Sequence, residues 1–392
     1  MDKVRYGIIG LGNQGSYYTK LFKNGDIPKG VITALCDNNP KKIEIIKGRY
    51  ELSDVTFFGD YIEMLDSGLC DVIVVATPHY FHPEMVVTCL KRGFHVICDK
   101  PAGVYAKQVR EMNEEAVKHD RIFGMMFNQR TNCTYKKMRE MIANGDIGEI
   151  QRVTWTITNW VRTQQYYNSG GWRATWSGEG GGVLINQCPH QLDLVQWIVG
   201  DMPMAVRGFC SYGKYHEVEI EDEVTAYFEY KNGATGVFIT TTGEWPGANH
   251  LEISGTKGKL VCEGGAKLTF HKSEFDTRDF IKDYTLVGDR AAPAIEVIEV
   301  DTGDDRPEHR GIFNNFNECV LGNEPLFVSG TEGINMVQLM NAIEYSGWMG
   351  GERVVLPVDE DTYLSALNEK AKNSKKTGDV VESVSATTMS AN

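Results

Sequence analysis

A lysine and a histidine far apart in the chain stand in settings that suit proton chemistry. Lys100 lies in "CDKPAG" (98–103), directly after the apolar run "GFHVI". His190 ends "GEGGGVLINQCPH" (178–190), after a run of glycines. An imidazole has a pKa near working pH and suits a general base, and an ammonium can stabilise negative charge developing on an alcohol oxygen. The pair therefore predicts removal of a proton from a hydroxyl group.

Asn186 is a third candidate, because it lies four residues before His190 and shares a helix face with it if that turn is helical. Pro189 allows this only if it sits in the first turn of a helix. An amide can orient an imidazole or bind a substrate hydroxyl, but it carries no charge. We therefore expect Asn186 to position its neighbours rather than to ionise.

The glycines Gly10, Gly12 and Gly15 form G-x-G-x-x-G between an apolar strand and a helix. Gly10 permits a tight turn, Gly12 lets the backbone approach a pyrophosphate, and Gly15 lets helix and strand pack closely. The free N–H groups at the helix N-terminus favour the phosphate charge. This arrangement predicts a dinucleotide site.

Asp37 follows the second predicted strand, at the spacing that the dinucleotide motif requires. Its carboxylate can accept hydrogen bonds from the adenosine ribose and repels a 2′-phosphate, so NAD is expected and NADP is less favoured. Lys41 and Lys42 lie close enough in sequence to temper that preference.

The elements that must position these residues change in type near residue 150. Before it, strands such as "DVIVVATP" (71–78) alternate with helical stretches such as "PEMVVTCLKRG" (83–93), which indicates βαβ units and a parallel sheet. After it, "EVTAYFEYKNG" (223–233) and "TGVFITTTGEW" (235–245) indicate strands joined by a hairpin at "NG". A late helix is predicted over 332–350.

Two segments resemble the signatures of the Gfo/Idh/MocA (glucose-fructose oxidoreductase/inositol dehydrogenase) family. They are "VVATPHYFHPEMVVTCLKRGFHVICDKP" (74–101) and "GEGGGVLINQCPHQLDLVQWIVG" (178–200), and the resemblance covers roughly residues 3 to 350. It implies oxidation or reduction of a secondary alcohol on a sugar or cyclitol. The family lysine, histidine and acid correspond to Lys100, His190 and Asn186, and Asp99 replaces the more usual glutamate before the lysine.

The predicted fold class is α/β, with an N-terminal Rossmann parallel sheet and a C-terminal α/β domain with a large open, mostly antiparallel sheet. We expect an NAD-binding domain over 1–128, a substrate-binding and oligomerisation domain over 129–370, and a polar, partly disordered tail over 371–392. The resemblance also implies a homodimer or homotetramer formed through the open sheet.

The expected site residues come from the motifs, from strand ends and from the resemblance. Trp172 and Arg173 suit a sugar but could equally be packed, whereas Asp193 is expected to be structural. Expected cofactor contacts are Gly10, Gly12, Asn13, Gln14, Gly15, Asp37, Ala76, Thr77, Pro78, His79, His82, Asp99, Lys100 and Asn128. Expected substrate contacts are Lys100, Arg130, Trp172, Arg173, Asn186, His190 and His309.

Composition narrows the possible partners. The 392 residues carry a net charge of −13 and no long basic block, which disfavours nucleic acid. No apolar run is long enough for a membrane span and the start of the chain does not resemble a signal peptide, so a cytoplasmic location is expected. The nine cysteines form no CxxC pair, and no metal motif is evident.

Three functions fit these observations. The first is an NAD-dependent dehydrogenase that acts on a sugar or glycoside, with C3 of a hexose as one position, and a cyclitol as an alternative substrate. The second is glycoside cleavage by transient oxidation and β-elimination, which needs a further base such as a tyrosine or His309. The third is a regulator that binds NAD and a sugar without turnover, which the presence of both Lys100 and His190 disfavours.

Overall fold

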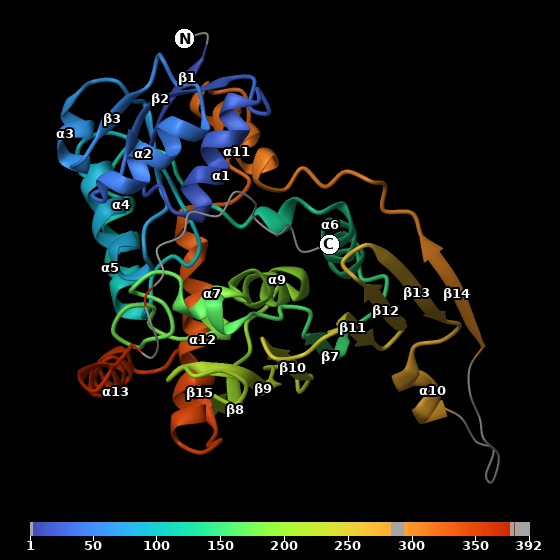
Figure 1. Ribbon diagram of the computed structural model, residues 1–392. Coiled ribbons are helices and arrows are strands. Elements are labelled where there is room, and N and C mark those ends of the chain that lie inside the picture. The colour runs from blue at the N-terminus through green and yellow to red at the C-terminus, as the bar shows by residue number, and fades with distance from the viewer. Residues whose placement is uncertain (1–2, 284–293, 377–379, 381–392) are drawn as a thin grey trace.

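The N-terminal sheet has six parallel strands in the order β3-β2-β1-β4-β5-β6 (Figure 1). The computed structural model describes residues 3–283, 294–376 and 380. Strands such as β4 are buried along their whole length, as expected where helices cover both faces of a parallel sheet. The strands are β1 (Val4–Ile9), β2 (Gly30–Cys36), β3 (Thr56–Phe58), β4 (Val72–Val75), β5 (His95–Cys98) and β6 (Phe123–Met125).

Helices connect these strands and lie around the sheet (Figure 1). Short 3₁₀ turns, η1 (His79–Phe81) and η2 (Asn128–Thr131), follow β4 and β6 at the carboxyl edge of the sheet. The helices are α1 (Asn13–Lys23), α2 (Pro40–Arg49), α3 (Tyr61–Asp66), α4 (His82–Lys91) and α5 (Ala106–Ala116). Helix α6 (Cys133–Ala143) follows η2 and packs against α9 (Pro189–Val199), on the side of the second sheet (Figure 1).

The second sheet has nine strands in the order β14-β13-β12-β11-β7-β10-β9-β8-β15. All neighbouring strands are antiparallel except β7 and β10, which run parallel. The strands are β7 (Ile150–Ile157), β8 (Ala205–Tyr212), β9 (Glu221–Glu229), β10 (Thr235–Thr241), β11 (Asn249–Gly255), β12 (Gly258–Glu263), β13 (Lys267–Ser273), β14 (Ile295–Val300) and β15 (Val354–Val355).

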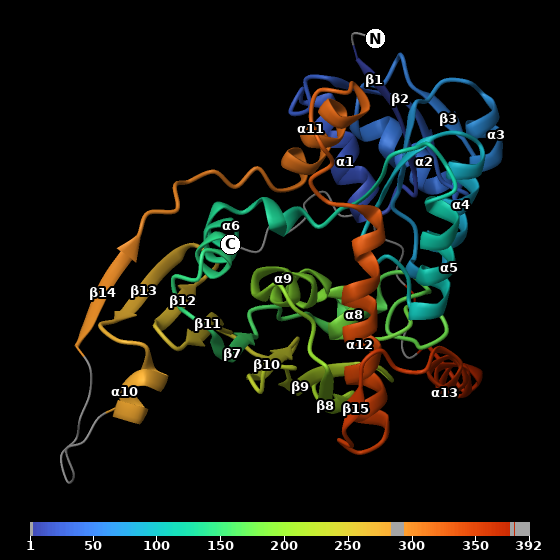
Figure 2. The same cartoon turned by 180° about the vertical axis from the view of Figure 1, so that it is seen from behind.

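Helices cover the face of the second sheet that looks toward the first one (Figures 1 and 2). The long helix α12 packs on β8 and against α9, and it runs up to the N-terminal sheet. The opposite face carries exposed apolar side chains such as Phe209 and Tyr227. The helices that follow β7 in the chain, not all of which lie on this face, are α7 (Gln164–Asn168), α8 (Val183–Asn186), α9 (Pro189–Val199), α10 (Thr277–Asp283), α11 (Glu308–Val320), α12 (Gly333–Trp348), α13 (Glu360–Lys372) and the 3₁₀ turn η3 (Gly330–Glu332).

Helix α11 crosses back to the N-terminal sheet, beside α1 (Figure 1). Asn317 on α11 accepts a hydrogen bond from the hydroxyl of Tyr6 at 2.7 Å, and Phe313 packs edge-on against the same ring. The chain beyond residue 128 therefore contributes to both halves of the molecule and brings His309 toward the glycine loop.

The predicted fold class is confirmed, and so is the hairpin at "NG". Gly233 has a φ of +87°, and the turn joins β9 to β10. The patterns did not indicate β8 or β14. The expected disorder of the tail falls mostly on residues 377–379 and 381–392, which lie outside the described residues.

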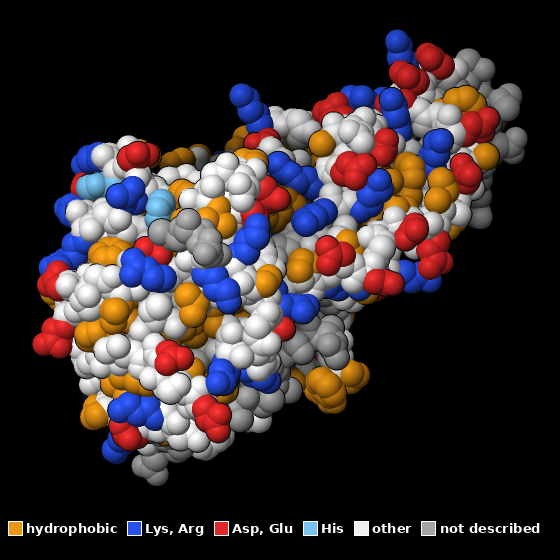
Figure 3. Space-filling view, turned by 90° about the horizontal axis from the view of Figure 1, so that it is seen from above, with side chains coloured by type: hydrophobic (Ala, Val, Ile, Leu, Met, Phe, Trp, Pro, Cys, Tyr) orange, Lys and Arg blue, Asp and Glu red, His pale blue; other side chains and the backbone are white. Residues whose placement is uncertain are grey.

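The surface carries charges of both signs. Seen from above, Lys and Arg side chains are interspersed with Asp and Glu side chains (Figure 3). Within the described residues, no helix combines the length and the apolar composition needed to cross a membrane.

Candidate active site

The glycine loop between β1 and α1 has the shape that its sequence predicts. Gly10 has a φ of +95°, and a Cβ added there would lie 2.5 Å from the carbonyl oxygen of Ala76. A Cβ on Gly15 would lie 1.9 Å from the carbonyl oxygen of Gly10, so helix and loop touch at this position. At Gly12, by contrast, an added Cβ would meet no atom within 4 Å. The loop is therefore tightly packed at Gly10 and Gly15 and has open space beside Gly12, which fits a phosphate group.

Asp37 lies beside this loop, at the end of β2. It is 5% exposed, and one carboxylate oxygen accepts a hydrogen bond from the backbone N–H of Leu11 at 2.8 Å. The other oxygen accepts the N–H of Asn39 at 2.9 Å. Lys42 approaches the carboxylate to 3.4 Å, so this lysine partly offsets the negative charge that would repel a 2′-phosphate.

The residues predicted after β4 form the wall next to the loop. The N–H of Ala76 donates to Ile9, and Thr77, Pro78 and η1 follow. The ring of His82 is buried between two backbone carbonyls, those of Thr77 and Pro101, at 2.7 Å each. His82 therefore links this wall to the segment after Lys100. Both of its ring nitrogens are occupied by these two carbonyl oxygens.

Lys100 is half-buried and lies just beyond β5, which ends at Cys98. Its ammonium donates a hydrogen bond of 2.9 Å to the backbone carbonyl of Asn186, which joins the two sequence motifs directly. Its backbone N–H donates to the carboxylate of Asp99, which is buried. Burial lowers the pKa of Lys100, although the Asp99 charge opposes this. Lys100 is thus a cation that is only partly exposed to solvent.

The Lys100 charge acts on four histidines, which are His79, His82, His190 and His309. Burial, followed by the charges of Lys100 and His309, lowers the pKa of His190 well below its ordinary value. Burial and then the Lys100 charge lower the pKa of His309 to about 3. The Nδ1 atoms of both rings have no hydrogen-bond partner among the described residues. Both imidazoles are therefore neutral near pH 7, and the Nδ1 atom of each is available for a hydrogen bond to a ligand.

His309 reaches this place from α11 and lies against α1. Its Nε2 is 3.0 Å from the amide nitrogen of Gln14, and its ring packs at 5.2 and 5.7 Å from the rings of Tyr17 and Tyr18. Asn13 and Gln14 open α1 just beyond Gly12. His309 is thus held at the junction of the glycine loop and the cleft.

Asn186 and His190 do not share one helix, as the spacing suggested they could. Helix α8 ends at Asn186, and α9 begins at Pro189, so the proline occupies the first helical position, which it tolerates well. The amide of Asn186 accepts a hydrogen bond from the hydroxyl of Tyr166 at 3.1 Å and donates one to Glu179. Its side chain is therefore oriented by the substrate-side loop rather than by His190.

Glu179 is a buried carboxylate that the sequence reasoning missed. It is 1% exposed, accepts the N–H of Ala174 at 2.6 Å, and lies 3.6 Å from the guanidinium of Arg173. Burial raises its pKa, and Arg173 opposes this. The signal for it was its position inside the run "SGEGGG", where a charged residue interrupts glycines.

Tyr166 was also missed as a hydrogen-bonding centre. Its hydroxyl accepts from Arg173 at 2.8 Å and from the amide of Gln187 at 3.0 Å, in addition to its bond to Asn186. The Arg173 guanidinium lies over both the Tyr166 ring and the Trp172 ring, at 4.6 and 4.4 Å. One network thus joins the substrate-side residues.

Two contacts hold the loop that carries this network. The ring of Trp172 packs edge-on against His79 at 5.1 Å, and His79 Nδ1 lies 3.0 Å from the carbonyl oxygen of Glu179. From the end of the chain, the ammonium of Lys376 donates to the carbonyl oxygen of Arg173 at 2.9 Å and to that of Tyr167.

Arg130 does not face the cleft as a substrate contact, which corrects the prediction for this residue. Its guanidinium is fully buried and bonded to both carboxylate oxygens of Asp193, at 2.7 and 2.6 Å, and to Glu332 at 2.6 Å. A guanidinium with these partners has few donors left for a ligand. Asp193 has the structural role that was expected. Asn128, at the start of the same turn, keeps an amide oxygen without a described partner.

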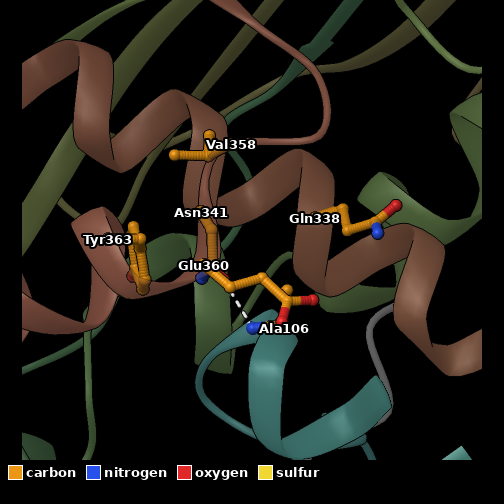
Figure 4. A pocket seen from close by; sticks show the side chains of 6 residues that line it. All are labelled: Ala106, Gln338, Asn341, Val358, Glu360 and Tyr363. Atoms are coloured by element: carbon orange, nitrogen blue, oxygen red, sulfur yellow. Dashed lines mark hydrogen bonds between the residues drawn. The ribbon is translucent and has the colours of Figure 1, made fainter.

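A small pocket away from the cleft lies between α5, α12 and α13 (Figure 4). Its central residue, Asn341, accepts the N–H of Ala106 at 2.9 Å and donates to the carbonyl oxygen of Val104 at 3.0 Å. Asn341 therefore fixes the turn that follows the Lys100 segment. The pocket is lined by Ala106, Gln338, Asn341, Val358, Glu360 and Tyr363.

Comparison with known proteins agrees with this geometry. Residues 4–127 match the model of the oxidoreductase family with an NAD-binding Rossmann fold, and residues 135–261 match that of the GFO/IDH/MocA C-terminal domain. One relative is a myo-inositol 2-dehydrogenase of Thermotoga maritima, 25% identical over 280 residues (68% of this chain and 77% of the relative). Another is a D-glucoside 3-dehydrogenase of Escherichia coli, 29% identical over 204 residues (50% and 54%).

The solved structures show the same fold. The WlbA dehydrogenase from Bordetella pertussis, solved with NADH and UDP-GlcNAcA, superposes with a TM-score of 0.77 at 24% identity, and the match covers 92% of this chain and 99% of that one. The two family models together span more than half of the chain. The chain therefore belongs to the Gfo/Idh/MocA family of oxidoreductases, with an NAD-binding Rossmann domain at its N-terminus.

Proposed function

We propose that this protein is a dehydrogenase that oxidises a secondary hydroxyl of a sugar or glycoside, with Lys100 and His190 handling the proton. The observation that carries the proposal is the half-buried ammonium of Lys100, which donates to the backbone carbonyl of Asn186, four residues before His190. Burial, and after it the Lys100 charge, lowers the pKa of the half-buried imidazoles of His190 and His309. A neutral imidazole beside a fixed cation suits removal of a proton from an alcohol.

The two residues have different roles. His190 accepts the hydroxyl proton, because its lowered pKa keeps the ring neutral at neutral pH. Lys100 donates a hydrogen bond to the same oxygen and stabilises the negative charge that develops there. NAD supplies the hydride acceptor when it is bound. Asn186 positions the substrate side, because its amide already bonds Tyr166 and Glu179.

The residues that hold the cofactor are those of the open glycine loop. Gly12 leaves room for a phosphate, and Asp37 is placed to bind the adenosine ribose. We propose NAD rather than NADP on the strength of the Asp37 carboxylate, with Lys42 reducing the discrimination. The remaining predicted cofactor contacts, from Ala76 to His79 and at Asp99 and Asn128, are part of this proposal.

The position oxidised is proposed to be C3 of a hexose. The relative that acts as a D-glucoside 3-dehydrogenase supports this assignment, and the myo-inositol 2-dehydrogenase supports a cyclitol as the alternative substrate. Exposed Phe209 and Tyr227 on the open sheet face support a homodimer or homotetramer. The cytoplasmic location and the division at residues 128 and 370 remain predictions.

Glycoside cleavage is a second candidate, favoured by one observation. His309 is a second neutral imidazole with an unpartnered Nδ1, close to Lys100. After transient oxidation at C3 the hydrogen at C2 becomes acidic, and His309 could remove it. The aglycone would then leave, and return of the hydride would regenerate NAD, so that no NADH accumulates.

One experiment separates these functions. The protein is incubated with a panel of sugars, inositols and glycosides and with NAD or NADP, while NADH absorbance and aglycone release are followed together. NADH formation with a sugar or glycoside supports the main proposal, and formation with inositols alone supports the cyclitol alternative. Aglycone release without NADH supports cleavage. Tight NAD binding with no turnover of any compound contradicts all three and supports the regulator.

A further inference from the structure

Four polar side chains around one pocket have an atom without a hydrogen-bond partner among the described residues. They are the amide oxygens of Asn128, Asn159 and Gln191 and the indole N–H of Trp160. An unpaired buried polar atom costs about 1–3 kcal/mol, so native proteins rarely leave several together without a ligand or water. The grouping of four such atoms around a single hollow needs an explanation.

Several polar groups around the pocket are paired. Asn249 accepts the indole N–H of Trp155 at 3.0 Å, and Asn132 donates to the carbonyl oxygen of Gly265 at 3.0 Å. The amide nitrogen of Gln191 donates to Gln129 at 3.0 Å, which leaves only its oxygen unpaired. At Gln191 the unpaired oxygen is therefore held in place by the bond that its own amide nitrogen makes.

The pocket adjoins the proposed reaction centre on three sides. Gln191 follows His190, and Glu308 precedes His309. Asn128 follows Phe127, whose ring lies 6.4 Å from the His190 ring. Between the pocket and the substrate-side network, the guanidinium of Arg162 lies over the rings of both Trp160 and Tyr166, at 5.5 and 5.0 Å. The pocket therefore lies beside residues of the proposed reaction centre.

The chemistry of the pocket favours an uncharged, hydroxyl-rich group. Three amide oxygens accept hydrogen bonds from hydroxyls, and the indole N–H donates one. The charged side chains that line the pocket are Arg306 and Glu308, one of each sign, so no excess positive charge invites a phosphate or carboxylate. Trp160 and Ile157 add apolar surface to the lining, which suits the C–H groups of a sugar ring.

We propose that this pocket binds a second sugar-like ring, joined to the ring whose hydroxyl is oxidised. The substrate class is then an uncharged two-ring glycoside, such as a disaccharide, rather than a free monosaccharide or an inositol. This inference rests on the proposed function for its reacting ring. It goes beyond the proposed function by assigning Asn159, Trp160 and Gln191 to recognition of the second ring, while Asn128 keeps its proposed place as a cofactor contact.

The test compares a methyl glycoside with a disaccharide that carries the same ring at the reacting position. The double variant Asn159→Ala/Trp160→Phe removes one acceptor and the indole donor from the pocket. We expect its kcat/KM to fall at least about tenfold for the disaccharide, mainly through KM, and by less than about threefold for the methyl glycoside. The matched control is Asn144→Ala/Trp245→Phe, at two exposed positions, and it should change neither value.

Equal losses on both substrates would mean that the pocket holds the reacting ring or supports the fold, and would overturn the inference. No preference of the wild-type protein for two rings would also overturn it, because the unpaired atoms would then be bound to water only.

A binding measurement keeps this test independent of turnover. Calorimetry measures the binding of cellobiose and of methyl β-glucoside to the NAD-loaded Lys100→Met protein. Both titrations are then repeated with a protein that carries Asn159→Ala and Trp160→Phe in addition to Lys100→Met. If no sugar is oxidised by the wild-type protein but cellobiose binds more tightly through the pocket, the proposed function fails and the pocket assignment stands. If oxidation occurs without this binding preference, the pocket assignment fails alone.

Discussion

The two sides of the cleft are built from different chemical groups. The cofactor side is made of backbone: Gly10, Gly12 and Gly15 shape a loop that leaves open space in front of Gly12, and Asp37 is fixed by two backbone N–H donors. The substrate side is a chain of side chains in which Tyr166 and Glu179 hold Arg173 and Asn186.

This difference shows how each side responds to change. A backbone site depends on space, so a single added methyl group can close it. A side-chain network depends on partners, so loss of one member weakens its neighbours by degrees. Lys100 belongs to both sides, because its backbone bonds Asp99 and its ammonium bonds Asn186.

The largest effect is therefore expected at Lys100. Lys100→Met should lower kcat by about 10³-fold or more, because it removes the cation that stabilises the reacting oxygen, while NAD binding stays near the wild-type value. Steady-state kinetics and NAD titration measure the two quantities. Lys107→Met, which removes an exposed lysine paired with Asp361, is the control and should be nearly neutral. Retained turnover in Lys100→Met would contradict the assigned role.

The next effect tests the backbone side. Gly12→Ala should keep the fold, with less than about 1 kcal/mol lost, because its Cβ meets no protein atom, yet weaken NAD binding about tenfold or more. Gly15→Ala should instead destabilise the protein, because its Cβ would overlap the carbonyl of Gly10. Thermal unfolding and NAD titration separate these results. Normal NAD affinity in Gly12→Ala would mean that the phosphates bind elsewhere.

A smaller effect is expected on the side-chain network. Glu179→Gln keeps one acceptor but removes the charge that pairs with Arg173, so kcat/KM should fall about tenfold while kcat changes less. Exposed Glu51→Gln is the control for loss of one carboxylate. An unchanged kcat/KM would show that the network is held by Tyr166 alone.

The smallest effect concerns the support behind the substrate side. Glu221 accepts the N–H groups of Gly182 and Leu184, and a Cβ on Gly181 would lie 2.5 Å from Glu344. Burial, followed by the charge of Glu221, raises the pKa of Glu344 well above its ordinary value. An acid whose folded pKa is raised stabilises the fold at low pH and loses that contribution as pH rises through the folded pKa.

The thermal midpoint should therefore fall by a few degrees as pH rises from about 5 to about 9, and Glu344→Gln should flatten that slope. Thermal unfolding across this pH range measures it. An equally steep slope in the variant would assign the pH dependence to other groups.

Features that depend on local backbone geometry and on chain order could be predicted from the amino-acid sequence. G-x-G-x-x-G and the following acid predicted the loop and Asp37, because a strand, a tight turn and a helix impose their spacing within a few residues. Alternation of strands and helices predicted the parallel sheet, and two motifs identified the family. Elements without such local sequence signals were not predicted. They include β8 and the break between α8 and α9.

The contacts between side chains from distant elements could not be predicted in this way. Arg130 looked available at the end of a strand, but Asp193 and Glu332 enclose it from two distant elements. Glu179, Tyr166 and the unpaired pocket atoms acquire their roles from neighbours up to a hundred residues away, and His309 arrives on a helix that crosses back to the first sheet. Such contacts depend on packing between elements, which local spacing does not encode, because a side chain's partners are set by the whole fold and its burial.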